Sequence, residues 1–149
     1  MTAVTEQKQV NYYEQLGGAA GIRQLVNDFY DDMEQAGDAT ELRRMHAADL
    51  SAMRQTLFEF LSGWLGGPRV YWERTNAKCM MSAHAGMPIS SLEAEQWLRC
   101  MRRALDKLPA DSAACDFIHH AFTKVCQAMI NRPSVESNVE SSVEATPQA

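Results

Sequence analysis

The stretch AHAGMPISSLEAEQWLRCM, residues 83–101, carries the features from which the rest of the chain can be interpreted. A histidine, His84, is followed by a break at Pro88, and a helix then begins that has Trp97 in its first half. Ser90 and Glu93 have the spacing of a capping box, so this helix is predicted from Ser90 to about Leu108. Imidazole binds iron well, and an indole beside it suits a haem pocket. A lone histidine before a proline is more often an ordinary exposed or satisfied side chain, so both interpretations stay open.

Helical periodicity recurs along the chain, whereas strand signals are weak. The positions i, i+3, i+4, i+7, i+8 and i+11 are apolar over about 19–35, which predicts an amphipathic helix. Its predicted inner face contains Ile22, Leu25, Val26, Phe29, Tyr30 and Met33. Further helices are expected at about 50–63, 79–85 and from 112 towards Pro133, with a turn at 40–45 and a loop at 69–77. This pattern alone allows an ordinary four-helix bundle.

The composition points to one domain with its own core. The chain has 149 residues, 46% of them hydrophobic, and a formal net charge of −5. No basic stripe is present, which argues against nucleic acid as the main partner. No signal peptide and no membrane-spanning run is apparent, so a soluble cytoplasmic protein is expected. We expect a flexible segment at 1–10, a folded domain at 11–132 and a disordered tail at 133–149.

The four cysteines argue against several kinds of site. None of them forms a Cys-x-x-Cys pair, which argues against a zinc site or a thioredoxin-like motif. Because Cys-x-x-Cys-His is also absent, any haem would be held without thioether links, as haem b. Free and mostly buried thiols are expected in a reducing compartment. The cysteines are Cys79, Cys100, Cys115 and Cys126.

Several short motifs occur in a fixed order, and together they carry a resemblance to a known family. They are Leu16-Gly17-Gly18, Phe29-Tyr30, Trp64-Leu65-Gly66-Gly67-Pro68, the segment around His84, and Trp97-Leu98-Arg99-Cys100-Met101. Over about residues 11–131 the chain resembles the group II truncated haemoglobins. This resemblance implies an all-α fold, the 2-on-2 globin sandwich, in which the helix pairs B/E and G/H enclose haem.

The resemblance also implies roles for four residues. His84 aligns with the proximal ligand of the haem iron. Tyr30, Trp97 and His46 align with distal positions, where their side chains would act on a bound ligand and serve catalysis. Tyr30 or His46 is also a possible sixth iron ligand, so we expect a mixed or six-coordinate low-spin ferric form.

Other positions would contact the haem itself. Met53 and Leu57 align with helix E positions that face the distal side, and neither donates a hydrogen bond. Candidates near the haem propionates lie in the following loop, and they are Arg69, Tyr71 and Lys78. The chain departs from the family at Ala83, where an arginine is usual, and at Gly86-Met87, where Pro-Phe is usual. Met87 can fill the space of the missing phenylalanine.

The expected ligands are O2, NO, CO or peroxide, and the expected activity is their chemistry rather than bulk O2 transport. NO dioxygenation and peroxidase-like turnover both need an electron donor. The chain has no Gly-x-Gly-x-x-Gly motif, so a separate reductase is predicted. A monomer or weak homodimer is expected. Two alternatives stay open: a haem-based sensor or binding module without turnover, and a haemless helical domain in which His84 is a bystander.

Overall fold

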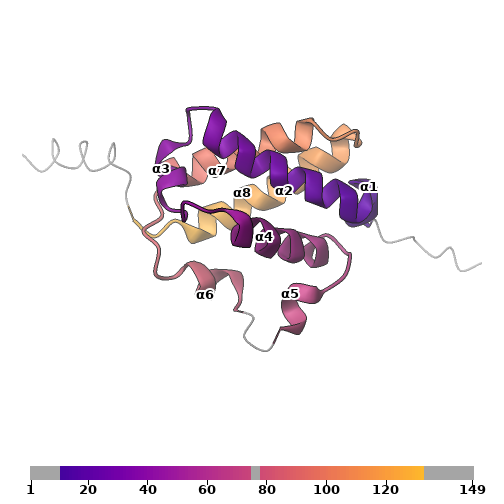
Figure 1. Cartoon of the computed structure of the whole chain (residues 1–149), viewed down its shortest axis with the longest axis horizontal. Coiled ribbons are helices and arrows are strands. Elements are labelled where there is room, and N and C mark those ends of the chain that lie inside the picture. Colours follow the sequence, from indigo (N-terminus) through magenta and orange to yellow (C-terminus); the bar gives the residue numbers. More distant parts are fainter. Residues whose placement is uncertain (1–10, 75–77, 133–149) are drawn as a thin grey trace, which may run out of the picture.

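The computed structural model describes residues 11–74 and 78–132, and its regular secondary structure there is helical throughout. The predicted N-terminal segment and C-terminal tail lie outside these residues. The helices, shown in Figure 1, are α1 Tyr12–Gln15, α2 Gly18–Gln35, α3 Thr40–Arg44, α4 Ser51–Trp64, α5 Val70–Glu73, α6 Met80–His84, α7 Ser91–Asp106 and α8 Ser112–Met129.

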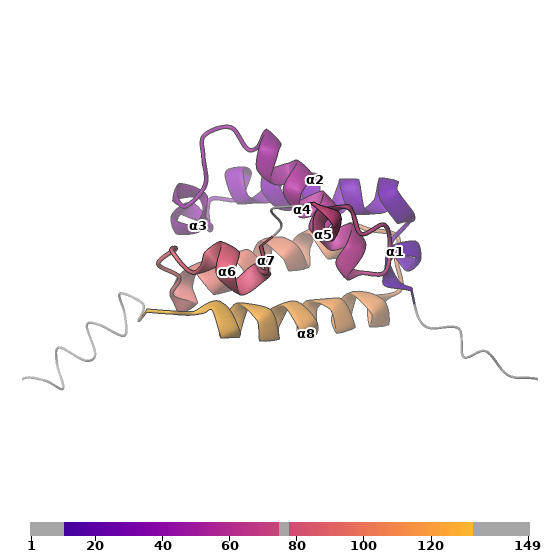
Figure 2. The same ribbon diagram turned by 90° about the horizontal axis from the view of Figure 1, so that it is seen from below.

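The four long helices form two packed pairs. Helix α2 packs against α4 and α7, and α8 packs against α7. Figure 2 shows α2 and α4 in one layer and α7 and α8 in the other, with the short helix α6 at the edge of the stack. The expected 2-on-2 arrangement is therefore confirmed. The inner faces meet in a core whose fully buried side chains include Ile22, Leu25, Phe29, Leu61, Met101, Leu105 and Ile118.

The predicted helix starts agree with the hydrogen bonds found there. The capping box of Ser90 and Glu93 is present at the start of α7. Asp111 accepts a bond from the Ala113 N–H at the start of α8, and Asp49 accepts one of 2.9 Å from the Ser51 N–H before α4. Because such bonds satisfy N–H groups that have no partner within a helix, the local sequence helps to fix where α7 and α8 begin.

Two short helices differ from the prediction. The expected loop at 69–77 is wrong for Val70–Glu73, which form α5, and α1 was not predicted at all. Periodicity cannot reveal a helix of one turn, and α5 forms where the chain packs on α4. A Cβ atom on Gly63 would lie 2.5 Å from Cζ3 of Trp72, so only glycine allows this approach. The neighbouring Tyr71 ring lies edge-on to Phe60 of α4, with centroids 5.4 Å apart.

None of the helices in the described ranges is long and apolar enough to cross a membrane.

Candidate functional site

A cavity of about 460 Å³ lies between the layers and α6. This volume is in the range of cofactor sites, roughly 300–1,000 Å³. Each helix from α2 to α8 contributes at least one residue to the wall of this cavity. Its lining is mostly apolar and consists of Tyr30, Leu42, Met45, His46, Ala47, Met53, Thr56, Leu57, Phe60, Leu61, Tyr71, Ala83, His84, Met87, Ile89, Glu93, Ala94, Trp97, Phe122, Val125, Cys126 and Met129.

The inner faces of α4 and α8 are only partly covered by protein at this cavity. Leu57 and Phe60 on α4, and Val125 and Met129 on α8, are half-buried, although their spacing places them towards the other layer. Protein interiors pack with few voids larger than a water molecule. Apolar side chains facing such a large internal space therefore indicate a bulky apolar occupant.

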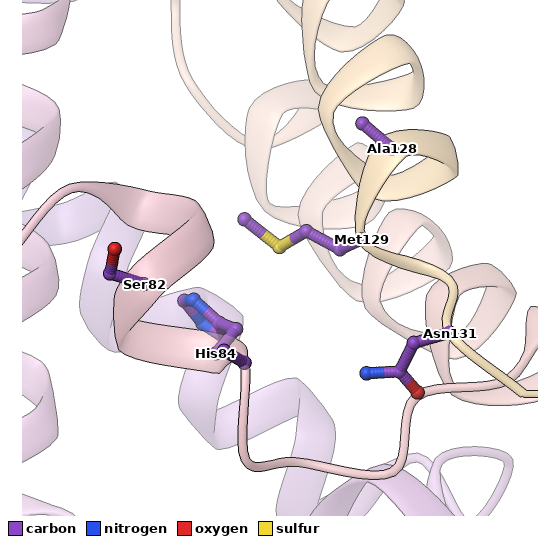
Figure 3. Close-up of a pocket in the computed structure, with 6 residues that line it drawn as sticks. Ser82, His84, Ala128, Met129 and Asn131 are labelled. Atoms are coloured by element: carbon purple, nitrogen blue, oxygen red, sulfur yellow. The ribbon is translucent and has the colours of Figure 1, made fainter.

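His84 is the last residue of α6 and lines this cavity from the edge of the stack. It also borders a second, more open cavity of about 430 Å³ between α6 and the end of α8. Figure 3 shows Met129 projecting from α8 towards α6, which carries His84. The imidazole of His84 thus stands at the boundary between the two cavities.

Tyr30 brings a hydroxyl group from α2 to the same cavity. Its side chain is 2% exposed, and its ring meets the Phe29 ring edge-on with centroids 5.0 Å apart. Burial raises the pKa of Tyr30 to about 12, an effect that the charge of Arg54 only partly offsets. The phenol therefore keeps its proton at neutral pH and serves as a hydrogen-bond donor.

His46 follows α3, and its ring lies close to Tyr30, with centroids 5.9 Å apart. Its Nδ1 is 2.8 Å from the carbonyl oxygen of Leu42. Burial is the main cause that lowers the pKa of His46, so the ring is neutral at pH 7. With the single proton on Nδ1 donated to that carbonyl, Nε2 carries a lone pair. This tautomer suits His46 to coordinate a metal and not to donate from Nε2.

Leu42 is itself held by a buried glutamine on α7. The side-chain oxygen of Gln96 accepts a 2.9 Å bond from the Leu42 N–H, and its amide nitrogen donates to Glu41 at 2.6 Å. Gln96 is 3% exposed. It thereby fixes α3, and with it the carbonyl that orients His46, against α7. The buried position of Gln96 cannot be recognised from the sequence, because a glutamine on a helix normally indicates an exposed face.

Trp97 lies one residue further along α7 and lines the cavity. Its ring packs between Phe29 and Phe122, with both centroid distances 5.0 Å. The structure therefore brings Tyr30, His46, Trp97 and His84 to one space from four different parts of the chain.

Some of the residues that are expected to contact a haem line the cavity, and others do not. Met53 and Leu57 line the cavity, as do Tyr71 and Met87, and Met53 and Met87 are 37% and 39% exposed. Arg69 and Lys78 are not in the lining. The Arg69 guanidinium lies over the Trp72 ring at 5.1 Å, and the Tyr71 hydroxyl donates to the Lys78 carbonyl at 2.6 Å.

Helix α8 contributes four lining residues that the sequence did not point to as site residues, and they are Phe122, Val125, Cys126 and Met129. Burial raises the pKa of the Cys126 thiol to about 12, so this thiol carries its proton at neutral pH.

This set of residues fits a haem group. His84 supplies one imidazole, the single protein ligand that a globin-type haem iron requires. The apolar residues of α4, α7 and α8 supply walls for the faces of a large flat ring. Cationic partners for propionates are absent from the described lining, where Tyr71 and Thr56 are the hydroxyl-bearing residues besides Tyr30.

Comparison with known proteins identifies the family. The profile of the bacterial-like globins matches residues 11–131. The group 2 truncated hemoglobin YjbI of Bacillus subtilis is 27% identical over 124 residues, which span 83% of this chain and 91% of the relative. The cold-adapted truncated hemoglobin of Pseudoalteromonas haloplanktis superposes with a TM-score of 0.79 at 34% identity, covering 83% of this chain and 99% of that structure. The group II 2-on-2 hemoglobin of Agrobacterium tumefaciens gives the same TM-score at 32% identity, with 87% and 99% covered. The chain therefore belongs to the bacterial-like globin family, in its group II truncated haemoglobin branch.

Proposed function

We propose that this globin binds haem b through His84 and uses it for chemistry of O2, NO or peroxide rather than for bulk O2 transport. As a globin, the chain binds haem and a small ligand. The observation that supports the finer proposal is the shared cavity, in which one edge imidazole and three polar aromatic side chains meet among apolar residues.

Each polar side chain has a separate task. Tyr30 keeps its proton and donates a hydrogen bond to a small ligand that carries partial negative charge. The indole N–H of Trp97 is a second donor, since indole nitrogen cannot accept. His46 presents a lone pair on Nε2, which makes it the candidate for the sixth iron ligand, whereas the raised pKa of Tyr30 disfavours a phenolate in that role.

The apolar residues of the lining offer no hydrogen bond to a bound ligand. Met53 and Leu57 face the ligand space without offering a hydrogen bond, so retention of a ligand depends on Tyr30 and Trp97. A hydrogen bond made among the apolar side chains that line this cavity is stronger than the same bond in water, because the local dielectric constant is low. Strong retention favours reaction of the ligand over its release.

Bound haem supplies an iron centre that coordinates diatomic molecules or peroxide and exchanges one electron. Turnover then requires an external reductant, and a separate reductase remains our proposal for its source. We also propose that the protein is cytoplasmic and that it is a monomer or a weak homodimer.

The test is absorption spectroscopy of the full chain, produced with haem supply. We expect a Soret band that shifts on reduction by dithionite and again on addition of CO. His84→Ala should abolish these spectra, whereas the matched control His120→Ala, on the exposed side of α8, should preserve them. A wild-type protein without a Soret band would refute haem binding. Haem binding without turnover of NO or peroxide, with a reductant present, would refute the enzymatic part.

A further inference from the structure

The segment that carries His84 has little packing support from the neighbouring helix. The second cavity, of about 430 Å³, lies between α6 and the end of α8, where Ala128 and Met129 form its other wall. A Cβ atom added to Gly86 would meet no atom within 4 Å, so the chain just after His84 is also open to its surroundings. Hydrogen bonds that hold the chain on either side of α6 therefore matter for its position.

Hydrogen bonds at Asn131 provide this restraint on the far side of the cavity. The side-chain nitrogen of Asn131 donates to the Met87 carbonyl at 2.7 Å, and its oxygen accepts from the Ile89 N–H at 2.9 Å. The backbone N–H groups of Asn131 and Arg132 both donate to the Ile89 carbonyl, at 2.9 and 3.2 Å. Figure 3 shows Asn131 at the point where the chain after α6 passes the end of α8.

The path from this amide to His84 is short. The Met87 N–H donates to the His84 carbonyl at 3.0 Å, while the Met87 carbonyl accepts from Asn131. Two hydrogen bonds through one residue therefore connect the backbone of His84 to the end of α8. On the other side of α6, the Tyr71 hydroxyl bonds the Lys78 carbonyl at 2.6 Å. Hydrogen bonds therefore hold the chain both before and after α6.

We propose that Asn131 is a positioning residue for His84, and that it sets the orientation of the proximal imidazole and the retention of haem. This inference rests on the proposed binding of haem through His84. Asparagine suits the role because one amide can donate to Met87 and accept from Ile89 at the same time. An aspartate keeps the acceptor but places negative charge against the Met87 carbonyl, and an alanine removes both bonds.

The test compares Asn131→Ala and Asn131→Asp with the wild type in the haem-loaded full chain. In Asn131→Ala we expect haem to dissociate about tenfold faster, the change that loss of two partly exposed hydrogen bonds corresponds to. The iron–histidine stretching band in the resonance Raman spectrum of the ferrous protein should shift or broaden. Asn131→Asp should be intermediate in both measurements.

Asn11 offers a matched control at the opposite end of the molecule. Its side chain also makes two hydrogen bonds, to the Gly66 carbonyl and from the Glu14 N–H. Asn11→Ala should lower the midpoint of unfolding by about as much as Asn131→Ala does, but it should leave the iron–histidine stretching band unchanged. Equal bands in Asn131→Ala and wild type, or an equal shift in Asn11→Ala, would overturn the inference alone. A wild-type protein that binds no haem would overturn the proposed function as well.

Discussion

Replacing Gln96 with leucine should have two effects: it should destabilise the protein, and it should disturb the distal side of the cavity. Leucine fills a similar volume but leaves the Leu42 N–H buried without its 2.9 Å partner. An unsatisfied buried donor costs about 1–3 kcal/mol, and the bond to the exposed Glu41 adds a smaller amount. We therefore expect a loss of about 2–3 kcal/mol in the free energy of unfolding.

The assay is denaturant unfolding of the ferric protein at saturating haem, with the slope m compared between variants. Gln55→Leu is the matched control, because Gln55 is exposed and makes one bond, of 3.0 Å, from Arg23. It should cost less than about 0.5 kcal/mol, as exposed substitutions usually do. Gln96→Leu should also change the ferric absorption spectrum, because the carbonyl that orients His46 belongs to Leu42. Equal losses in the two variants would refute the reasoning.

Three further predictions concern single side chains. Tyr30→Phe should speed O2 dissociation roughly ten- to a hundredfold in stopped-flow experiments, since one donor to a charged ligand is lost; CO dissociation, measured in the same variant, should change little. His46→Ala should remove the low-spin component of the ferric absorption spectrum, and an unchanged spectrum would exclude His46 as sixth ligand. Hydrogen bonding to Arg103 lowers the pKa of Asp38, so the ionised carboxylate stabilises the folded protein. This stabilisation is fully present above the ordinary pKa of an aspartate and is lost as the pH falls through the lowered pKa of Asp38. The difference in stability between wild type and Arg103→Gln should therefore narrow below about pH 4, and a constant difference would contradict the assignment.

The long helices could be predicted because each has a complete local signal. The inner face predicted for 19–35 is buried at all six positions, and the capping box starts α7 where the sequence placed it. Four-residue helices have no such signal. Helix α5 exists because Gly63 admits Trp72, and these two residues are far enough apart in sequence that no periodicity connects them.

The site was only partly predictable for a related reason. Tyr30, His46, Trp97 and His84 could be named by resemblance, and the structure brings them to one cavity. The cavity itself cannot be predicted from the sequence, because Val125 and Met129 have the same spacing whether their side chains face other protein residues or a cofactor. Arg69 and Lys78 were chosen by charge and position in a loop, but their side chains are outside the lining. Charge alone does not give the direction of a side chain on an irregular segment.

The two sides of the cavity are held by different means, and this bears on the departures from the family pattern. On the distal side, the bond between Gln96 and Leu42 is buried between α3 and α7, so the position of His46 is tied to the core. On the proximal side, two of the hydrogen bonds that hold the chain before and after α6 are accessible to water. Backbone regions with few buried contacts open at lower free energy than the core does. The departures from the family pattern at Ala83, Gly86 and Met87 fall close to these exposed bonds, so we expect them to alter haem retention while the fold is preserved.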